Sequence, residues 1–246
     1  MAQHTRVDIA TKDGVAPSHV FQPLGAGPWP AVLLYMDALG IRPAMLAMAE
    51  RLADMGYFVL LPDLFYREGA YGPFDAQAMV EDPAIREQVF ALLGSLTQQR
   101  VMDDSAAFFD FLAKAEDARL PAGLVGYCMG GGFALRAAGL FANQVAAAAS
   151  LHGAWLATDK PDSPHLVAAD IKGRVYVGVA GIDPLFPADE EGRLAAALRQ
   201  AGVDHMIEIY QGAEHGFAVD GHYAFNQAAA EKHWRRLAEI FADCLA

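Results

Sequence analysis

Short apolar segments alternate with segments of helical periodicity along most of this chain. Residues 31–36 (AVLLYM) and 57–61 (YFVLL) are continuous apolar runs, which is typical of strands covered on both faces. Between them, Pro43 fits the first turn of a helix that continues to about Met55, and Gly56 terminates it. Strand, helix and strand in this order predict a right-handed crossover between parallel neighbours.

The same alternation continues to the C-terminus, after an antiparallel hairpin predicted for residues 7–11 and 19–23. Further strands are predicted at 123–127, 145–151, 174–180 and 205–210, and helices at 101–115, 130–141, 190–200 and 224–245. Leu120 and Pro121 are expected to separate the helix before them from the strand after them. The pattern predicts one α/β domain over residues 1–246, with a mainly parallel, twisted sheet and helices on both faces.

The ends of the predicted strands indicate where a site would lie. In a parallel sheet, ligands bind at the carboxyl ends of the strands. Four residues that can ionise or act as nucleophiles follow closely on such strands: Asp37, Cys128, Asp183 and His215. Residues 65–100 are less regular, with a mixed helical segment after residues 81–83, and are predicted to be an insertion. Residues 155–165 are predicted to be a loop, and both segments are expected to border a pocket.

Composition narrows the class of partner. The 246 residues are 54% hydrophobic and 20% charged, which is enough to bury a large core. A formal net charge of −12 argues against general affinity for nucleic acid or anionic membrane. With only Cys128 and Cys244, no disulfide framework is expected, and neither a signal peptide nor a run of about 18 apolar residues is found. We therefore expect a cytoplasmic protein whose partner is a small molecule.

The sharpest local motif is Gly-Tyr-Cys-Met-Gly-Gly at residues 126–131, between a predicted strand and a predicted helix. Such a turn presents a nucleophile in a strained conformation, and the flanking glycines leave room for it, as in the elbow of the α/β-hydrolase fold. The start of the following helix favours a thiolate. Cys128 is therefore the candidate nucleophile, with a buried small side chain as the alternative interpretation.

A thiol needs a base, and His215 is the best-placed histidine. It follows the strand at 205–210, near the C-terminus, where this fold places its catalytic histidine. His152 follows another strand and is a candidate for the pocket or a structural histidine. Surface positions are expected for the others, His4, His19, His165, His205, His222 and His233.

The acid that orients the histidine should lie between nucleophile and histidine in the sequence, after a strand. Asp183 meets this condition, with a turn-forming aspartate before proline as the alternative interpretation. Asp189 is the competitor, but a position in the first turn of the next helix explains it by capping or by the helix dipole.

A second acid, Asp37, follows the strand at residues 31–36. It is either a carboxylate that acts on the thiol or a turn and capping residue, and the residues alone do not separate these interpretations. The loop after this strand supplies one oxyanion N–H group in the fold. Ala38 and Met129 are accordingly the predicted backbone donors.

Taken together, these residues resemble the dienelactone hydrolase family, also called the carboxymethylenebutenolidases, over almost the whole chain. Its pattern of a G-x-C-x-G-G elbow, an early acid, a later acid before proline and an H-G-F histidine corresponds here to residues 126–131, Asp37, Asp183 and 215–217. The resemblance implies the α/β-hydrolase fold and a Cys-His-Asp triad. It also implies a hydrogen bond between the early acid and the resting thiol.

Two positions depart from the family pattern. The early acid is typically glutamate, so the shorter Asp37 is expected to contact Cys128 over a longer distance, indirectly or not at all. The arginine that follows the histidine in dienelactone-cleaving members is missing from residues 217–220. Candidates for binding substrate instead are Arg86 and Arg100, for which surface positions are nevertheless favoured, together with His152 and Trp155.

The leading functional hypothesis is hydrolysis of an enol-lactone or another activated carboxylic ester through an S-acyl intermediate. A thiolate leaves readily, so the tetrahedral adduct collapses to product only when the departing oxygen is well stabilised. A broad thiol carboxylesterase or acyl transferase is the second hypothesis, and a non-catalytic small-molecule-binding protein is the third. The joint presence of Cys128, Asp183 and His215 favours an enzyme, with no metal or cofactor required. The oligomeric state is left open.

Overall fold

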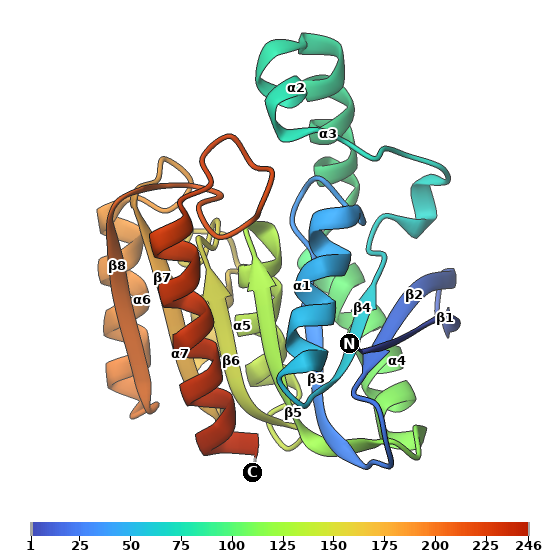
Figure 1. The fold of residues 1–246 in the computed structure, drawn as a ribbon. Coiled ribbons are helices and arrows are strands. Elements are labelled where there is room, and N and C mark those ends of the chain that lie inside the picture. The colour runs from blue at the N-terminus through green and yellow to red at the C-terminus, as the bar shows by residue number, and fades with distance from the viewer. Residues whose placement is uncertain (1, 246) are drawn as a thin grey trace.

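A single eight-stranded sheet runs through the computed structural model, which describes residues 2–245 (Figure 1). The strands are β1 (Gln3–Thr11), β2 (Gly14–Gln22), β3 (Trp29–Tyr35), β4 (Phe58–Pro62), β5 (Ala118–Tyr127), β6 (Val145–Leu151), β7 (Arg174–Ile182) and β8 (His205–Glu214). The helices are α1 (Pro43–Asp54), α2 (Ala76–Glu81), α3 (Pro83–Ser95), α4 (Gln98–Lys114), α5 (Met129–Leu140), α6 (Ala188–Ala201) and α7 (Gln227–Leu245), with 3₁₀ turns η1 (Tyr66–Glu68) and η2 (Pro164–Asp170).

The strand order is β1-β2-β4-β3-β5-β6-β7-β8. Strand β2 pairs antiparallel with both β1 and β4, and every other neighbouring pair is parallel. The predicted α/β class with a mainly parallel sheet is therefore confirmed. Parallel pairing brings the ends of β3, β5, β6, β7 and β8 to one edge of the sheet, where residues far apart in sequence meet.

One predicted boundary is wrong. Strand β5 begins at Ala118 and continues through Leu120 and Pro121, which were expected to break the chain before the strand. Its pairing with β3 shifts register between Pro30 and Val32, so Pro121 falls in an irregularity of the ladder rather than in a regular pair. Proline has no N–H group to donate to a neighbouring strand, so it is tolerated only at places such as this irregularity, where a regular ladder bond is not made.

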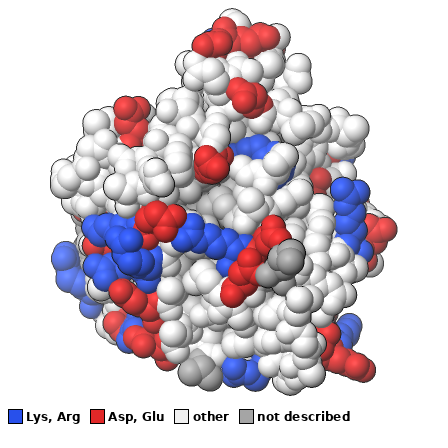
Figure 2. Space-filling view, viewed as in Figure 1, with Lys and Arg blue, Asp and Glu red and all other residues white. Residues whose placement is uncertain are grey.

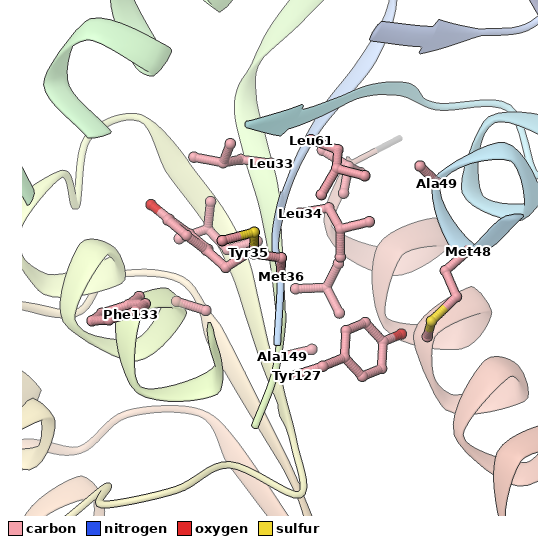
Figure 3. Packing of buried hydrophobic residues seen from close by; sticks show 14 of the residues in the cluster. Leu33, Leu34, Tyr35, Met36, Met48, Ala49, Leu61, Tyr127, Phe133 and Ala149 are labelled. Carbon is pink, nitrogen blue, oxygen red and sulfur yellow. The ribbon is translucent and has the colours of Figure 1, made fainter. Parts of the chain in front are cut away.

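Helices cover both faces of the sheet (Figure 1). Helices α1 and α7 lie on one face, and α4, α5 and α6 on the other. Figure 3 shows Tyr35 of β3 pointing towards Phe133 of α5, with ring centroids 6.4 Å apart, while Leu34 points to the opposite side. Burying each such side chain contributes about 1.5–3 kcal/mol. The alternating sides of β3 thus hold both helical layers against the sheet.

Buried hydroxyl groups in these layers find partners. The Tyr35 hydroxyl hydrogen-bonds with Ser105 of α4 at 2.8 Å, and the Tyr127 hydroxyl with His233 of α7 at 3.0 Å. His233 is fully buried and His19 nearly so, which corrects the surface positions expected for both. Burial lowers the pKa of His233 to about 3, so this ring is a neutral structural partner of Tyr127.

Residues 65–100, predicted to be less regular with a mixed helical segment after residues 81–83, contain two consecutive helices, α2 and α3. Asp75 accepts from the N–H of Ala78 and Asp82 from that of Ala84, so each helix has its own N-cap. Helix α3 lies where the helical segment was predicted, and the six-residue α2 is the addition. The pair projects above the carboxyl ends of the strands (Figure 1), and acidic side chains gather at its tip (Figure 2). Helix α3 is thereby placed over the predicted site.

No helix within residues 2–245 is both long and apolar enough to cross a membrane.

Candidate active site

Cys128 occupies the sharp turn that joins β5 to α5, as the sequence predicted. Its backbone angles are φ 55° and ψ −122°, a left-handed conformation that a residue with a side chain rarely adopts. The Cys128 N–H donates to the carbonyl of Leu151 at 3.2 Å, and its own carbonyl accepts from Gly131 and Ala154 at 3.0 and 3.1 Å. Backbone bonds from two neighbouring segments therefore hold the strained residue in place.

The glycines on either side are required by close backbone contacts. A Cβ atom on Gly126 would overlap the carbonyl of Gly130, and one on Gly130 would lie 2.5 Å from the carbonyl oxygen of Tyr35. A side chain at either position would push β5, α5 and β3 apart. The G-x-C-x-G spacing is thus a packing condition for bringing the start of α5 to the end of β5.

His215 and Asp183 form a hydrogen-bonded pair on the neighbouring strand ends. His215 Nδ1 lies 2.8 Å from Asp183 Oδ2, and the other Asp183 oxygen accepts from the N–H of Leu185 at 2.9 Å. The Asp183 side chain is buried. Asp189, the alternative acid, is exposed on α6 and pairs with Arg193 at 3.3 Å. Of the two acids, the structure brings Asp183 to the histidine.

The electrostatic surroundings of His215 favour its charged form. Burial alone would lower the pKa of the imidazole, but negative charge on Cys128 and the hydrogen bond with Asp183 outweigh it and raise the pKa of His215 to about 10. Within residues 2–245, Nε2 of His215 has no hydrogen-bond partner that satisfies distance and angle. This nitrogen is therefore free to exchange a proton with the thiol or a substrate.

Cys128 and His215 line the same cavity, of about 350 Å³. Its walls are mainly apolar and come from Ala38, Leu39, Met79, Val89, Phe90, Leu93, Trp155, Ile182, Pro184 and Leu185. The polar side chains are Asp37, His152, Glu214, His222 and Tyr223, and no lysine or arginine lines the cavity in the part of the chain that is described. The site therefore suits an apolar molecule with few polar groups and offers no lysine or arginine to a carboxylate.

His152 lies directly beside His215. The two ring centroids are 5.1 Å apart, and the His152 side chain is 1% exposed. Its backbone has φ 37°, held by an N–H bond to the Gly178 carbonyl at 2.8 Å. Burial and the neighbouring His215 hold the pKa of His152 well below its usual value, so the ring is neutral. Neither ring nitrogen has a hydrogen-bond partner among residues 2–245.

Asp37 is held by an arginine that the sequence analysis did not identify. Arg42 donates to both carboxylate oxygens, at 2.6 and 2.7 Å, and the N–H of Leu39 donates to one of them at 3.0 Å. Both charged side chains are buried. No hydrogen bond joins Asp37 to Cys128 in the described residues, so the contact implied by the family resemblance is absent in this structure. A buried carboxylate is normally paired with a cation, and Arg42 is the basic residue that follows Asp37 in the same loop. This pairing rule was the signal in the sequence that could have predicted the contact.

The two arginines proposed as substrate ligands are not at the cavity, and this corrects the prediction. Arg86 is exposed on α3 and donates to the carbonyl of Val80, in the last turn of α2, at 3.3 Å. Arg100 is exposed on α4 and donates to the carbonyl of Ser95, at the end of α3, at 2.7 Å. Both guanidinium groups instead satisfy carbonyls that helix ends leave without partners.

The other predicted site residues lie close to the nucleophile. Ala38 and Trp155 line the cavity with Cys128, while Met129, the first residue of α5, borders an adjoining cavity. The sequence analysis missed Tyr223 and expected His222 at the surface, yet both line the cavity. Burial lowers the pKa of His222 to about 4. Among the described residues, no group of three or more His, Cys, Asp or Glu side chains is arranged to hold a metal.

A strained residue between a parallel strand and a helix, with a histidine and an acid after later strands of the same sheet, defines a protein of the α/β-hydrolase fold. Solved structures agree. The chain superposes on a dienelactone hydrolase-like promiscuous phosphotriesterase from metagenomic libraries with a TM-score of 0.82 and 21% identity, over 100% of this chain and 99% of the other. It also matches Pyrococcus horikoshii acylaminoacyl peptidase with a TM-score of 0.73 and 17% identity, over 99% of this chain and 42% of that one.

Sequence comparison narrows the class to a family. The family model described as the dienelactone hydrolase family matches residues 17–245, and the chain belongs to this family. The chain is 30% identical over 236 residues to the carboxymethylenebutenolidase of Rhodococcus opacus, covering 93% of this chain and 86% of that protein. Family membership makes the protein a hydrolase of lactones or carboxylic esters.

Proposed function

We propose that the protein is a cysteine hydrolase that cleaves enol-lactones or other activated carboxylic esters through an S-acyl intermediate at Cys128. The observation that supports this proposal is the placement of Cys128 and His215 on one mainly apolar cavity, with His215 Nδ1 2.8 Å from Asp183 Oδ2. Asp183 fixes the ring orientation and stabilises its charge. Nε2 is then the nitrogen that exchanges a proton with the Cys128 sulfur.

The proposed cycle begins with the Cys128 proton held on His215. The thiolate attacks the carbonyl carbon, and the backbone N–H groups of Met129 and Ala38 receive the developing oxyanion. The adduct collapses with cleavage of the carbon–oxygen bond, and His215 gives its proton to the departing oxygen. His215 then takes a proton from water, the resulting hydroxide attacks the thioester, and the carbon–sulfur bond breaks to release the acid, which restores the Cys128 thiolate and the protonated His215.

The choice of activated esters follows from the leaving groups. Thiolate is expelled more easily than a simple alkoxide, so an alkyl ester or amide adduct returns to starting material. An enolate or aryl oxide leaves more readily, and His215 protonates it as it departs. Because the cavity has no lysine or arginine within the described chain, the proposed substrates are uncharged around the reacting bond. A lactone that carries a carboxylate would meet Asp37 and Glu214 instead.

Three further residues are proposed to support this chemistry. The Asp37–Arg42 pair ties residues 37–42 together and so positions the N–H of Ala38. His152, buried and without a partner for either ring nitrogen among residues 2–245, is proposed to hydrogen-bond an oxygen of the bound substrate. A satisfied structural histidine would have had its own partner in the protein.

We further propose that the protein acts in the cytoplasm on a small molecule, without nucleic acid or membrane partners. The two cysteines, Cys128 and Cys244, are both free, which suits a reducing compartment. The net charge of −12 disfavours polyanionic partners.

The test is hydrolysis of p-nitrophenyl acetate and an enol-lactone by the purified protein and by Cys128→Ala. We expect kcat/KM to fall at least about 1,000-fold in the variant, because His215 and Asp183 cannot contribute to catalysis once the thiol is removed. Mass spectrometry of the rapidly quenched parent should show an acyl adduct on Cys128. Unchanged hydrolysis in Cys128→Ala would exclude the proposal. Transfer of the acyl group to an added alcohol faster than to water would assign an acyl transferase instead.

A further inference from the structure

A second cavity, of about 490 Å³, adjoins the one that contains Cys128. Three side chains, Phe90, Leu93 and Trp155, border both cavities. Phe90 is 59% exposed and Trp155 is 43% exposed, which is unusual for two large aromatic side chains so close together. Exposed apolar side chains that line a hollow beside a nucleophile are typical of a ligand site.

The second cavity begins next to the nucleophile. Met129, which follows Cys128, lines it together with Phe133 of the same helix and Ala154. The remaining wall is supplied by the end of α3, the start of α4 and residues 158–164, and it includes Gly94, Leu96, Lys160 and Asp162. Lys160 and Asp162 carry opposite charges, so the cavity has no net preference for an ion. Its surface near the nucleophile is apolar.

The position of His215 decides which part of an ester would enter each cavity. His215 lines only the first cavity, and in the proposed mechanism it protonates the departing oxygen. The leaving group must therefore lie in the first cavity. The substituent on the other side of the carbonyl carbon points away from His215, past Met129 towards the second cavity.

We infer that the second cavity binds the acyl chain of the substrate, and that the natural substrates are esters or lactones with an extended, uncharged acyl chain. This inference rests on the proposed function. Trp155, which borders both cavities, separates the acyl chain from the leaving group, and its backbone N–H donates to the carbonyl of Leu185 at 3.0 Å, which fixes the main chain at this point. Each methylene that the second cavity buries should raise kcat/KM about fourfold.

Gly94 offers a way to fill this cavity alone. It lines the second cavity and not the first, and a Cβ atom built on it has no heavy atom within 4 Å. Gly94→Phe on α3 therefore places a ring in the acyl site without touching Cys128 or His215. Gly192→Phe is the matched control, because Gly192 on α6 is equally open and lines neither cavity.

The experiment measures kcat/KM for p-nitrophenyl acetate, butyrate and octanoate. In the parent and in Gly192→Phe we expect octanoate to be preferred over acetate. In Gly94→Phe the octanoate-to-acetate ratio of kcat/KM should fall at least about tenfold relative to the parent, and in Gly192→Phe it should not change. Leu96→Trp, at another position that lines only the second cavity, is the second variant should Gly94→Phe fail to fold.

The outcomes separate this inference from the proposed function. An unchanged ratio in folded Gly94→Phe or Leu96→Trp, with acetate hydrolysis still dependent on Cys128, would overturn the acyl site and leave the cysteine mechanism standing. A loss confined to phenyl acetates with longer para-alkyl groups would place the leaving group in this cavity and also overturn the inference. Acetate hydrolysis that persists in Cys128→Ala would remove the proposed function itself.

Discussion

The Arg42 guanidinium donates to both carboxylate oxygens of Asp37, at 2.6 and 2.7 Å, on the loop that leads from β3 into α1. Both side chains are less than a tenth exposed. The pair stands where the family pattern places an acid beside the nucleophile, yet within the described residues this acid is bonded to its own loop and not to Cys128. The negative charge at the cavity wall is thus largely compensated.

Removing one member of this pair should destabilise the protein strongly. Arg42→Met leaves a buried, uncompensated carboxylate and is expected to lower the free energy of unfolding by about 3–5 kcal/mol. Urea unfolding followed by circular dichroism measures the change. The exposed pair of Arg51 with Glu231 is the control, and Arg51→Met should cost less than about 1 kcal/mol. Equal losses of unfolding free energy in both variants would show that the buried pair stabilises the fold no more than the exposed pair does.

The histidine and its acid should differ in how much activity they carry. His215→Ala is expected to reduce kcat/KM at least about 1,000-fold. The loss in Asp183→Asn should be about 10–100 times smaller than the loss in His215→Ala, because the acid orients and stabilises the base. Steady-state kinetics on p-nitrophenyl acetate measures both. Asp189→Asn is the matched control and should stay within about twofold of the parent. Activity that depended on Asp189 and not on Asp183 would contradict the hydrogen bond seen here.

The ionisation of His215 should depend on the nucleophile. Its pKa, raised to about 10 against a usual value near 6.5, means that the folded protein binds this proton more tightly than the unfolded chain. The resulting stabilisation is fully present below about pH 6.5 and is lost as the pH rises through about 10.

NMR titration of the His215 imidazole tests this directly. We expect the ring to stay protonated to above pH 8 in the parent, and its pKa to decrease in Cys128→Ala because the negative charge of the sulfur is gone. His205 supplies an internal reference, since it lies outside both cavities. Identical titration of His215 in the two proteins would show that Cys128 does not act on it.

His152 should contribute to catalysis and not to stability. A buried polar group without a partner costs about 1–3 kcal/mol, so His152→Phe is expected to leave the unfolding free energy unchanged or to increase it. If His152 binds a substrate oxygen, kcat/KM should fall about tenfold, mainly through KM. Unfolding and steady-state kinetics of the same variant give the two readouts. A large loss of stability with unchanged KM would make His152 a structural residue.

Much of the fold followed from local patterns. Continuous apolar runs, such as the one that ends at Met36, predicted buried parallel strands because helices cover both faces of the sheet. The order of Cys128, Asp183 and His215 after three different strands predicted that they would meet, since parallel strands end at the same edge. Helix α3 coincides with the mixed helical segment predicted after residues 81–83, whereas the six-residue α2 is too short to show a helical period.

The sequence by itself determined the sheet, the strained cysteine turn and the order of the candidate catalytic residues, because these depend on hydrophobic period and on spacing within short segments. Only the tertiary structure decided the partners of individual charges. In the folded chain Asp37 forms an ion pair with Arg42, and Arg86 and Arg100 donate hydrogen bonds to carbonyls at helix ends. The ring nitrogens of His152 have no hydrogen-bond partner among residues 2–245. The tertiary structure also placed the two cavities next to each other, with side chains of α3 lining both. Such contacts depend on side-chain geometry between residues far apart in sequence, which no local period encodes.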